Sequence, residues 1–206
     1  MKMDTKKKIL YAAAEEFAIK GYSGTTIRDI CIRAGVNLAA VNYHFRSKEE
    51  LYNNMFEFLF TETQRENVLD RRWNGDFKEW KKSIKAWVVM SLDDIVNPNT
   101  LNRCKFQILC REMMDSSEIF PNIYEIYMSP IIRNLEAHFG KVMPKDAGKN
   151  DIYMRIFSVM SDCFFYFQNR VIVEKIFPDE QFARSNIKAI AELITEKACL
   201  GIERKK

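Results

Sequence analysis

The chain has 206 residues, of which 47% are hydrophobic, so it has enough apolar content to bury a core. Its net charge of +4 does not by itself establish binding to nucleic acid, although residues 1–52, with nine basic and six acidic side chains, supply +3 of that charge. The five cysteines are odd in number and include no C-x-x-C pair, which indicates neither a disulfide framework nor a metal site. The sequence shows no signal-peptide pattern and no stretch near the roughly 20 apolar residues of a membrane span. We therefore expect a soluble, cytoplasmic protein with free thiols and no cofactor.

Short helices with clear start and stop signals are predicted in the first quarter of the chain. Gly21 and Gly35 stand where helices stop, because glycine readily adopts the left-handed conformation that ends a helix. Thr26 and Asp29 have the spacing of a capping box, and Asn37 is placed to cap the next helix. The predicted helices cover residues 4–20, from 25 or 26 to 35, 37–45, and from 47 onward.

Longer helices are predicted in the rest of the chain. The segments between them contain proline, or clusters of asparagine, aspartate and serine, which favour turns. These helices cover about residues 77–96, 100–114, 122–139, 151–175 and 179–200. With about nine helices and few alternating β-branched runs, the predicted fold class is all-α. The contrast in helix length divides the chain into a three-helix helix-turn-helix domain, residues 1–50, and a C-terminal helical bundle, residues 51–206.

The segment TIRDICIRAGVNLAAVNYHF, residues 26–45, has the pattern of a helix-turn-helix. Gly35 permits the tight turn, and Val36 and Val41 pack the second helix against the first. The side chains left exposed on the second helix are short, so its backbone can approach base edges in a major groove about 12 Å wide. They are Leu38, Ala39, Ala40 and Asn42. The amide of Asn42 offers the donor and acceptor pair that suits adenine.

Groups suited to phosphate binding surround this predicted recognition helix. They are Thr25 and Thr26 at a helix N-terminus, Tyr43 and His44 after the reading positions, and Lys48 at the start of the fourth helix. Helix N-termini present free N–H groups and partial positive charge, so Lys48 is a predicted phosphate clamp. Other interpretations stay open. Tyr43 can be a core aromatic, His44 can pack under the fourth helix, and Arg28 can be a solvated charge.

Residues 8–60 resemble the DNA-binding domain of the TetR family of transcription regulators. The matching pieces are IL-x-AA-x-x-x-F-x-x-x-GY, G-TT-x-R-x-I, AGV and YHF-x-SK-EE-L, in this order along the chain. The resemblance implies that six residues contact DNA: Thr26, Arg28, Asn37, Tyr43, His44 and Lys48. In one departure, Asn42 stands where many members of the family have tyrosine. Residues 111–135 are also similar to the CecR-like branch of the family.

The C-terminal part is rich in aromatic and sulfur-containing side chains. The four adjacent aromatic residues 164–167 cannot all face one side of a helix, so some of them meet another surface, and we expect that surface to be a second protomer. The resemblance implies a homodimer through the last two long helices, about residues 151–175 and 179–200. Such a two-fold dimer presents two recognition helices about one turn of double-stranded DNA apart, which predicts a pseudo-palindromic operator.

The middle helices of TetR-like proteins enclose a ligand cavity, so the resemblance also implies a small-molecule effector. The side chains that we expect at this cavity are Trp87, Phe106, Cys110, Met114 and Tyr127. Their aromatic and sulfur chemistry suits a hydrophobic or aromatic compound. Arg111, Glu112 and His138 are interpreted as surface charges, with polar contacts to the effector as the alternative.

The sequence therefore predicts a ligand-responsive repressor that binds its operator as a dimer and is released by the effector. The choice of repression over activation comes from the family resemblance alone. An enzyme is not indicated, and no catalytic residue is expected, because the two histidines stand 94 residues apart and the chain has no nucleophile elbow or glycine-rich phosphate loop. A helical adaptor protein is the other alternative, but it does not explain short side chains surrounded by phosphate-binding groups.

Overall fold

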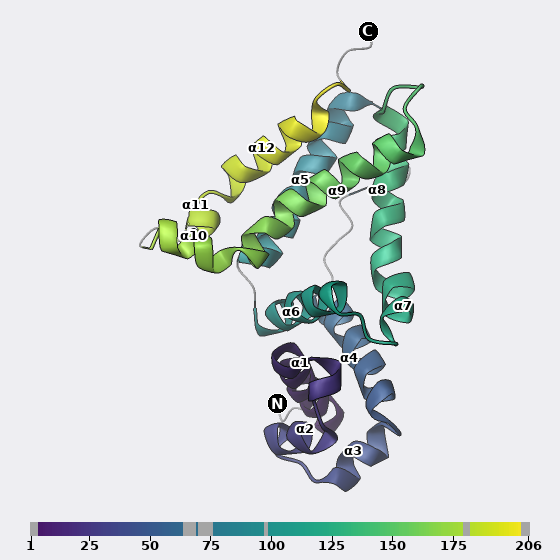
Figure 1. Ribbon diagram of the computed structural model, residues 1–206, viewed down its shortest axis with the longest axis vertical. Coiled ribbons are helices and arrows are strands. Elements are labelled where there is room, and N and C mark those ends of the chain that lie inside the picture. The colour runs from purple at the N-terminus through teal and green to yellow at the C-terminus, as the bar shows by residue number, and fades with distance from the viewer. Residues whose placement is uncertain (1–3, 64–68, 70–75, 97–98, 179–181, 203–206) are drawn as a thin grey trace. The chain divides into compact units, whose positions relative to one another are not determined.

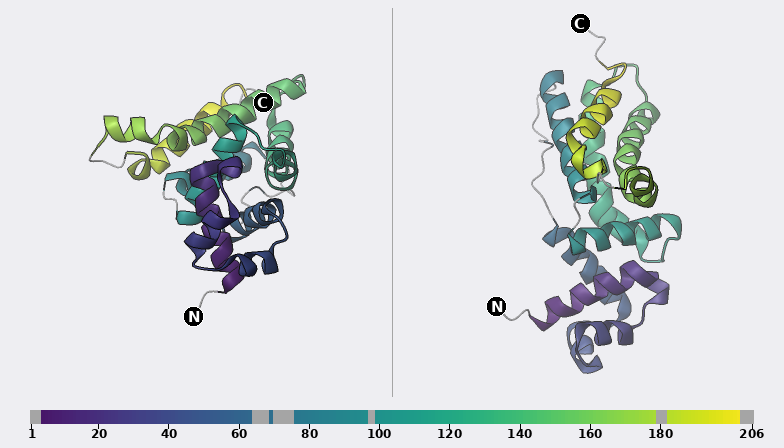
Figure 2. Two further views of the ribbon diagram at one scale, coloured as in Figure 1. Left: turned by 60° about the horizontal axis from the view of Figure 1, so that its bottom comes forward. Right: turned by 90° about the vertical axis from the view of Figure 1, so that its left-hand side faces the viewer.

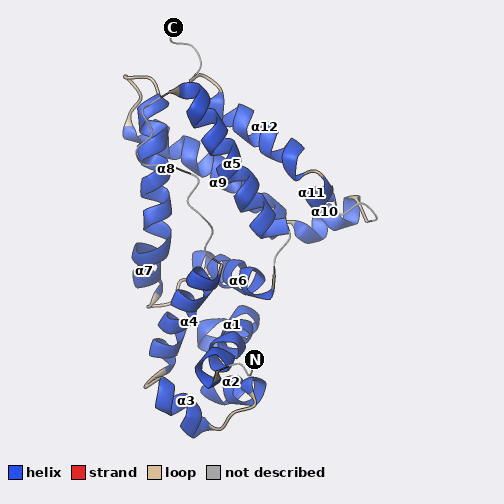
Figure 3. Ribbon diagram, turned by 180° about the vertical axis from the view of Figure 1, so that it is seen from behind, coloured by secondary structure: helices blue, strands red, loops and turns tan. Residues whose placement is uncertain are grey.

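The computed structural model describes residues 4–63, 69, 76–96, 99–178 and 182–202. In this part of the chain every regular element is a helix, which confirms the all-α class (Figure 3). These residues form twelve α-helical segments and one π-helical turn, more than the nine helices predicted. The chain divides into two compact units. Unit 1 comprises Met1–Arg65 and Asn99–Tyr127, and unit 2 comprises Glu66–Pro98 and Met128–Lys206.

Unit 1 contains the helices of the predicted helix-turn-helix and also helices from later in the chain (Figure 1). Its elements are α1 (Thr5–Gly24), α2 (Ile27–Ala34), α3 (Leu38–His44), α4 (Lys48–Glu62), α6 (Thr100–Met114), α7 (Phe120–Ile123) and most of the π-helical turn η1 (Tyr124–Met128). α6 packs against both α1 and α4, and so it belongs to the same core. The compact unit therefore differs from the predicted domain, whose boundary after residue 50 falls inside α4.

The first helix breaks at the glycine where the sequence predicted its end. α1 is regular up to Gly21, whose φ of 73° lies in the left-handed region that favours glycine. A final helical turn then runs to Gly24. The buried face of α1 carries the apolar residues whose spacing predicted it: Ile9, Leu10, Ala13 and Phe17.

Aromatic rings form much of the core of unit 1. Phe17 of α1 and Tyr52 of α4 pack edge to face with ring centroids 4.6 Å apart, and Tyr52 meets Phe56 at 5.1 Å. Tyr127 stacks on Phe60 at 4.5 Å, which joins the π-helical turn to α4. Because each buried ring removes a large apolar area from water, this cluster contributes strongly to the stability of the unit.

Unit 2 is a second helical core. Its elements are α5 (Phe77–Val96), α8 (Ser129–Val142), α9 (Lys149–Gln168), α10 (Arg170–Ile176), α11 (Phe182–Ser185) and α12 (Ile187–Cys199). α5 packs against α9 and α12, and α8 packs against α9 (Figures 1 and 2). Trp80 of α5, which is fully buried, meets Phe139 of α8 edge to face at 5.2 Å.

The last two predicted helices are each interrupted at an asparagine. The helix predicted over residues 151–175 divides into α9 and α10 at Asn169, whose side-chain amide donates to the carbonyl of Phe165. Asn186 makes the same kind of bond to Phe182 and separates α11 from α12. Asparagine side chains compete with the backbone for hydrogen bonds, which is why helices end at such positions. The predicted start of the last helix lies outside the described residues.

The cysteines are free thiols, as expected. Cys110 is half-buried and the other four are buried. Burial raises the pKa of the Cys163 thiol to about 12, so this side chain stays protonated at neutral pH and packs as a small apolar group. Among the described residues, no helix combines the length and the apolar content that crossing a bilayer requires.

Candidate nucleic-acid interface

α2 begins with the capping box that the sequence predicted. The hydroxyl of Thr26 accepts a hydrogen bond from the backbone N–H of Asp29 at 3.1 Å, and the Asp29 carboxylate accepts from the backbone N–H of Thr26 at 3.0 Å. The same carboxylate accepts from the Thr26 hydroxyl at 2.7 Å. Bonds from the hydroxyl and the backbone of Thr26 favour the ionised form and lower the pKa of Asp29 to about 2. The start of α2 is therefore held in one conformation.

A tight turn joins α2 to α3. Gly35 ends α2 with φ 65°, in the left-handed region, and its N–H donates to the carbonyl of Ile32 at 3.3 Å. Asn37 then caps α3, because its side-chain oxygen accepts from the N–H of Ala40 at 2.8 Å. Two short helices joined in this way form a helix-turn-helix.

α3 has one buried face and one exposed face. Val41 is 1% exposed and Phe45, directly after the helix, is 2% exposed, so these two side chains anchor α3 in the core. Tyr43 is 85% exposed, which places its ring outside the core. The side chains that are exposed or half-exposed are Leu38, Ala39, Ala40, Asn42, Tyr43 and His44. The open face of α3 therefore carries the residues predicted to meet DNA from this helix.

Thr25 differs from the other predicted DNA contacts. Its side chain is 1% exposed, and its hydroxyl lies 2.8 Å from the carbonyl of Gly21 and 3.2 Å from that of Glu16 as a hydrogen-bond donor. This hydroxyl is used inside the fold, and its side chain is not part of the interface proposed below. Arg28, in contrast, is exposed on α2.

Lys48 is the first residue of α4. Ser47 precedes it and caps the helix, since its hydroxyl accepts from the N–H of Glu50 at 3.0 Å. The Lys48 ammonium lies over the ring of Tyr22, with Nζ 4.5 Å from the ring centroid. Partial burial lowers the pKa of Lys48 from its usual value of 10.5. The ammonium is therefore held at one place beside the N-terminus of α4.

Ion pairs connect α2 to α1. Arg33 Nε donates to Glu16 at 2.6 Å, and Nη1 of the same guanidinium donates to Glu15 at 3.2 Å. Lys20 pairs with Glu16 at 2.9 Å and with Asp29 at 3.1 Å. Burial disfavours the ionised form of Glu16, but the bonds from Lys20 and Arg33 outweigh it and lower the pKa of this carboxyl. These pairs fix the direction in which α2 leaves α1.

Two adjacent residues of α6 that were interpreted as surface charges make hydrogen bonds to α1 and α4. Glu112 is 3% exposed and accepts from the Tyr52 hydroxyl at 2.6 Å, so the surface interpretation was wrong for this residue. Arg111 is exposed, yet Nε and Nη2 donate to the carbonyls of Ala18 and Ile19 at 3.0 and 2.6 Å. Sequence reasoning missed both roles because the partners lie 60 or more positions away along the chain.

The five side chains predicted at an effector cavity are divided between the units. Trp87 is half-buried on α5 in unit 2, and the other four belong to unit 1. Within unit 1, Tyr127 stacks on Phe60, and Met114 is 87% exposed at the end of α6. The structure thus does not gather the five within one unit. His138 of unit 2 is 3% exposed, so it is not a surface charge.

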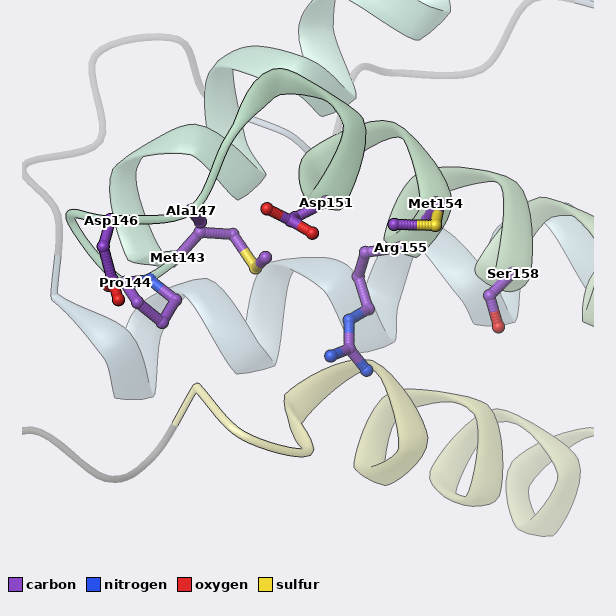
Figure 4. A pocket seen from close by; sticks show the side chains of 8 residues that line it. All are labelled: Met143, Pro144, Asp146, Ala147, Asp151, Met154, Arg155 and Ser158. Carbon is purple, nitrogen blue, oxygen red and sulfur yellow. The ribbon is translucent and has the colours of Figure 1, made fainter.

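A hollow of about 440 Å³ opens in unit 2 at the turn between α8 and α9 (Figure 4). It is lined by Met143, Pro144, Asp146, Ala147, Asp151, Met154, Arg155 and Ser158. The guanidinium of Arg155 points toward α12 and donates to the carbonyls of Lys197 and Leu200 at 3.0 and 2.9 Å (Figure 4). Arg155 is therefore engaged within the fold, and none of the five predicted effector residues lines this hollow.

The capped helices, the left-handed turn and the open face of α3 define a helical protein with a helix-turn-helix and an exposed recognition helix. A sequence profile described as "Bacterial regulatory proteins, tetR family" matches residues 9–55. Another, described as "HTH-type transcriptional dual regulator CecR, C-terminal domain", matches residues 98–203. The chain therefore belongs to the TetR family of transcription regulators and has a C-terminal part of the CecR type.

Individual proteins agree with this assignment. The probable HTH-type transcriptional regulator YttP of Bacillus subtilis (strain 168) is 42% identical over 55 residues, which is 27% of this chain and 27% of YttP. The HTH-type transcriptional dual regulator CecR of Shigella flexneri is 25% identical over 138 residues, 63% of this chain and 60% of CecR. The matches thus span less than two thirds of these relatives. Among solved structures, the hemolysin II transcriptional regulator HlyIIR shares the fold, with a TM-score of 0.64 and 21% identity over 93% of this chain and 97% of HlyIIR.

Proposed function

We propose that unit 1 binds double-stranded DNA with α3 in the major groove. The observation that carries this proposal is the two-sided character of α3, whose short side chains face outward while Val41 and Phe45 hold its other face in the core. The proposed DNA contacts are Thr26, Arg28, Asn37, Leu38, Ala39, Ala40, Asn42, Tyr43, His44 and Lys48. Those that surround α3 bind phosphates and set its register on the duplex.

Asn42 is the proposed base-reading residue. It is exposed on α3, and its carboxamide can make two hydrogen bonds to the major-groove edge of adenine. Ala39 and Ala40 add little bulk, so the helix can approach close enough for this contact. The side-chain oxygen of Asn37, in contrast, already caps α3.

The proposal includes a homodimer through α9 and α12. On α9, the exposed fractions of Met154, Phe157 and Phe165 are 62%, 52% and 47%; on α12 that of Leu193 is 68%, and Leu200, directly after α12, is 65% exposed. The spacing puts the three α9 side chains on one stripe of that helix. Large apolar side chains exposed in this way mark a surface that binds another protein. A two-fold dimer would offer two copies of α3 to a pseudo-palindromic operator.

The binding of DNA is tested by selecting bound sequences from random duplex DNA with the purified protein. A pseudo-palindrome with half-sites about one helical turn apart is the expected result. Asn42→Ala should change the preferred base at one position in each half-site, whereas Asn150→Ala, which removes an exposed amide from α9, should change none. If no motif is enriched at low salt and without added ligand, the proposed function is wrong.

In the complete proposal the protein is a cytoplasmic repressor that a hydrophobic or aromatic effector releases. Family membership supports repression, and the aromatic and sulfur chemistry of the five predicted side chains supports the class of effector. Those side chains are Trp87, Phe106, Cys110, Met114 and Tyr127. An effector can shift DNA affinity only by its own preference for one conformation over the other.

Replacement of Trp87 tests the effector site. Compounds that raise the unfolding temperature of the protein are first sought in a hydrophobic and aromatic library. Trp87→Ala should keep operator binding near normal and weaken both the thermal shift and the release of DNA. An unchanged response to the same compound would remove Trp87 from the effector site.

A further inference from the structure

The ammonium of Lys48, the proposed phosphate clamp, lies over an aromatic ring. Nζ of Lys48 lies 4.5 Å from the ring centroid of Tyr22, which belongs to the last turn of α1. A cation over the face of an aromatic ring is attracted by the negative charge of that face. Lysine has a long, flexible side chain, so this contact restricts where its ammonium can reach. The position of the Tyr22 ring therefore affects the position of the charge.

The backbone around Tyr22 is fixed by a residue of α6. α1 breaks at Gly21, whose non-helical backbone interrupts the regular pattern of helical hydrogen bonds at that point. Arg111 supplies donors, with Nε 3.0 Å from the carbonyl of Ala18 and Nη2 2.6 Å from that of Ile19. The guanidinium also passes beside Gly21, where an added Cβ would stand 3.9 Å from it. Arg111 thus holds the end of α1 from which Tyr22 projects.

Glu112, the residue after Arg111 on α6, supports the ring of Tyr22 through Tyr52. The centroids of the Tyr22 and Tyr52 rings lie 4.8 Å apart. The hydroxyl of Tyr52 donates to the buried carboxylate of Glu112 at 2.6 Å, and the other oxygen of Glu112 accepts from the N–H of Ser117 at 2.8 Å. Hydrogen bonds to a carboxylate are short and strong, so this arrangement fixes Tyr52 and the ring packed on it.

We infer that Arg111 and Glu112 are positioning residues for the phosphate contact of Lys48, and that they act through Tyr22. The inference rests on the proposed function, since it assumes that unit 1 binds DNA. All the residues involved belong to unit 1. A helix that lies outside the helix-turn-helix in sequence therefore sets the place at which one of its basic side chains meets the duplex.

A double-mutant cycle between Tyr22 and Lys48 tests this inference. The affinity of the purified dimer for a labelled duplex enriched in the selection is measured over a series of salt concentrations. Lys48→Ala should weaken binding roughly tenfold and lower the salt slope by about one counterion for each lysine removed. Tyr22→Leu should also lower the salt slope and should weaken binding roughly fivefold. Tyr22→Phe, which keeps the ring, should bind like the parent protein. In the Lys48→Ala background, Tyr22→Leu should have no further effect.

The α6 residues are tested in the same cycle. Arg111→Gln and Glu112→Gln should each weaken binding roughly threefold in the parent protein and have no effect in the Lys48→Ala background. Arg103→Gln removes an exposed charge from the same helix and serves as the control for long-range electrostatics. If Tyr22→Leu proves unfolded by circular dichroism, the two glutamine variants decide the question.

Two results would overturn the inference itself. Equal losses in the presence and absence of Lys48 would show that Tyr22 and α6 act only on the stability of the fold. An unchanged salt slope in Tyr22→Leu would show that the phosphate contact does not depend on the ring. A parent protein that enriches no duplex would instead remove the proposed function itself, so the two failures are distinguishable.

Discussion

The helix-turn-helix and the exposed faces of α9 and α12 present apolar groups to their surroundings in different ways. On α3, Leu38 is 54% exposed among alanine and asparagine side chains, and the preceding turn runs from Gly35 to the polar cap Asn37. On α9, large apolar side chains follow one another at helical spacing, with Phe157 more than half exposed, and on α12 Leu193 is 68% exposed. The first surface suits water, phosphates and base edges. The second suits another apolar surface, and so the proposed dimer is what completes it.

A charge on the α9 stripe should have the largest effect. Phe157→Glu would place an unpaired carboxylate in the proposed interface from each protomer, at a cost of about 3 kcal/mol or more, which is at least about a hundredfold in the dimer dissociation constant. Sedimentation should show monomers at concentrations where the parent protein is dimeric, and operator affinity should fall with the loss of paired half-sites.

Ile131→Glu is the matched control for this change. Ile131 is 42% exposed on α8, outside α9 and α12, so the same charge there should leave the dimer intact. A Phe157→Glu protein that remains dimeric would contradict the assignment of the interface to α9. The exposed apolar side chains of α9 and α12 would then need another explanation.

Local signals made the helix-turn-helix predictable from the sequence. Thr26, Gly35 and Asn37 act on backbone groups within a few residues of themselves, so their roles could be inferred from spacing alone. The same reasoning did not reveal that the hydroxyl of Thr25 turns inward to carbonyls of α1. Burial of a small polar side chain depends on tertiary packing that spacing does not contain.

The hydrogen bonds that join α6 to α1 and α4 could not be predicted in this way. Glu112 and Arg111 bind partners 60 and 93 positions away, which no local pattern connects. One signal was available for Glu112: it lies at helical spacing from Ile108 and Leu109, on the buried face of α6. A carboxylate at a core position indicates a buried polar partner, and the tyrosine that provides it became evident only in the folded chain.

Removal of that partner should have the second largest effect. Tyr52→Phe leaves one oxygen of the buried Glu112 carboxylate without its hydrogen bond, which should lower the free energy of unfolding by about 1–3 kcal/mol. Urea unfolding of the purified variant measures this loss. Tyr11→Phe, the same change on a half-buried ring of α1, is the control and should change stability little.

The pH dependence of this loss gives an independent test. Burial, with the bond to Glu112, raises the pKa of Tyr52 in the folded protein well above its usual value of 10.0. The contribution of Tyr52 is therefore fully present below pH 10.0 and is lost at higher pH, as the unfolded chain gives up its phenol proton first. The difference between parent and Tyr52→Phe should shrink above that pH. A difference that stays constant would mean that Tyr52 ionises equally in both states.

The smallest effect is expected at the cap of α2, where the interactions are local and exposed. The Asp29 carboxyl has a pKa of about 2, chiefly because it accepts bonds from the hydroxyl and the N–H of Thr26. Its stabilising contribution is present above the usual value of 3.8 and is lost as the pH falls through about 2. Thr26→Val should move the Asp29 pKa back toward 3.8 in a carbon-detected NMR titration, and Thr26→Ser should not. A pKa that stays near 2 in Thr26→Val would assign the shift instead to the backbone N–H of residue 26, which valine keeps, and to Lys20, which pairs with the other carboxylate oxygen at 3.1 Å.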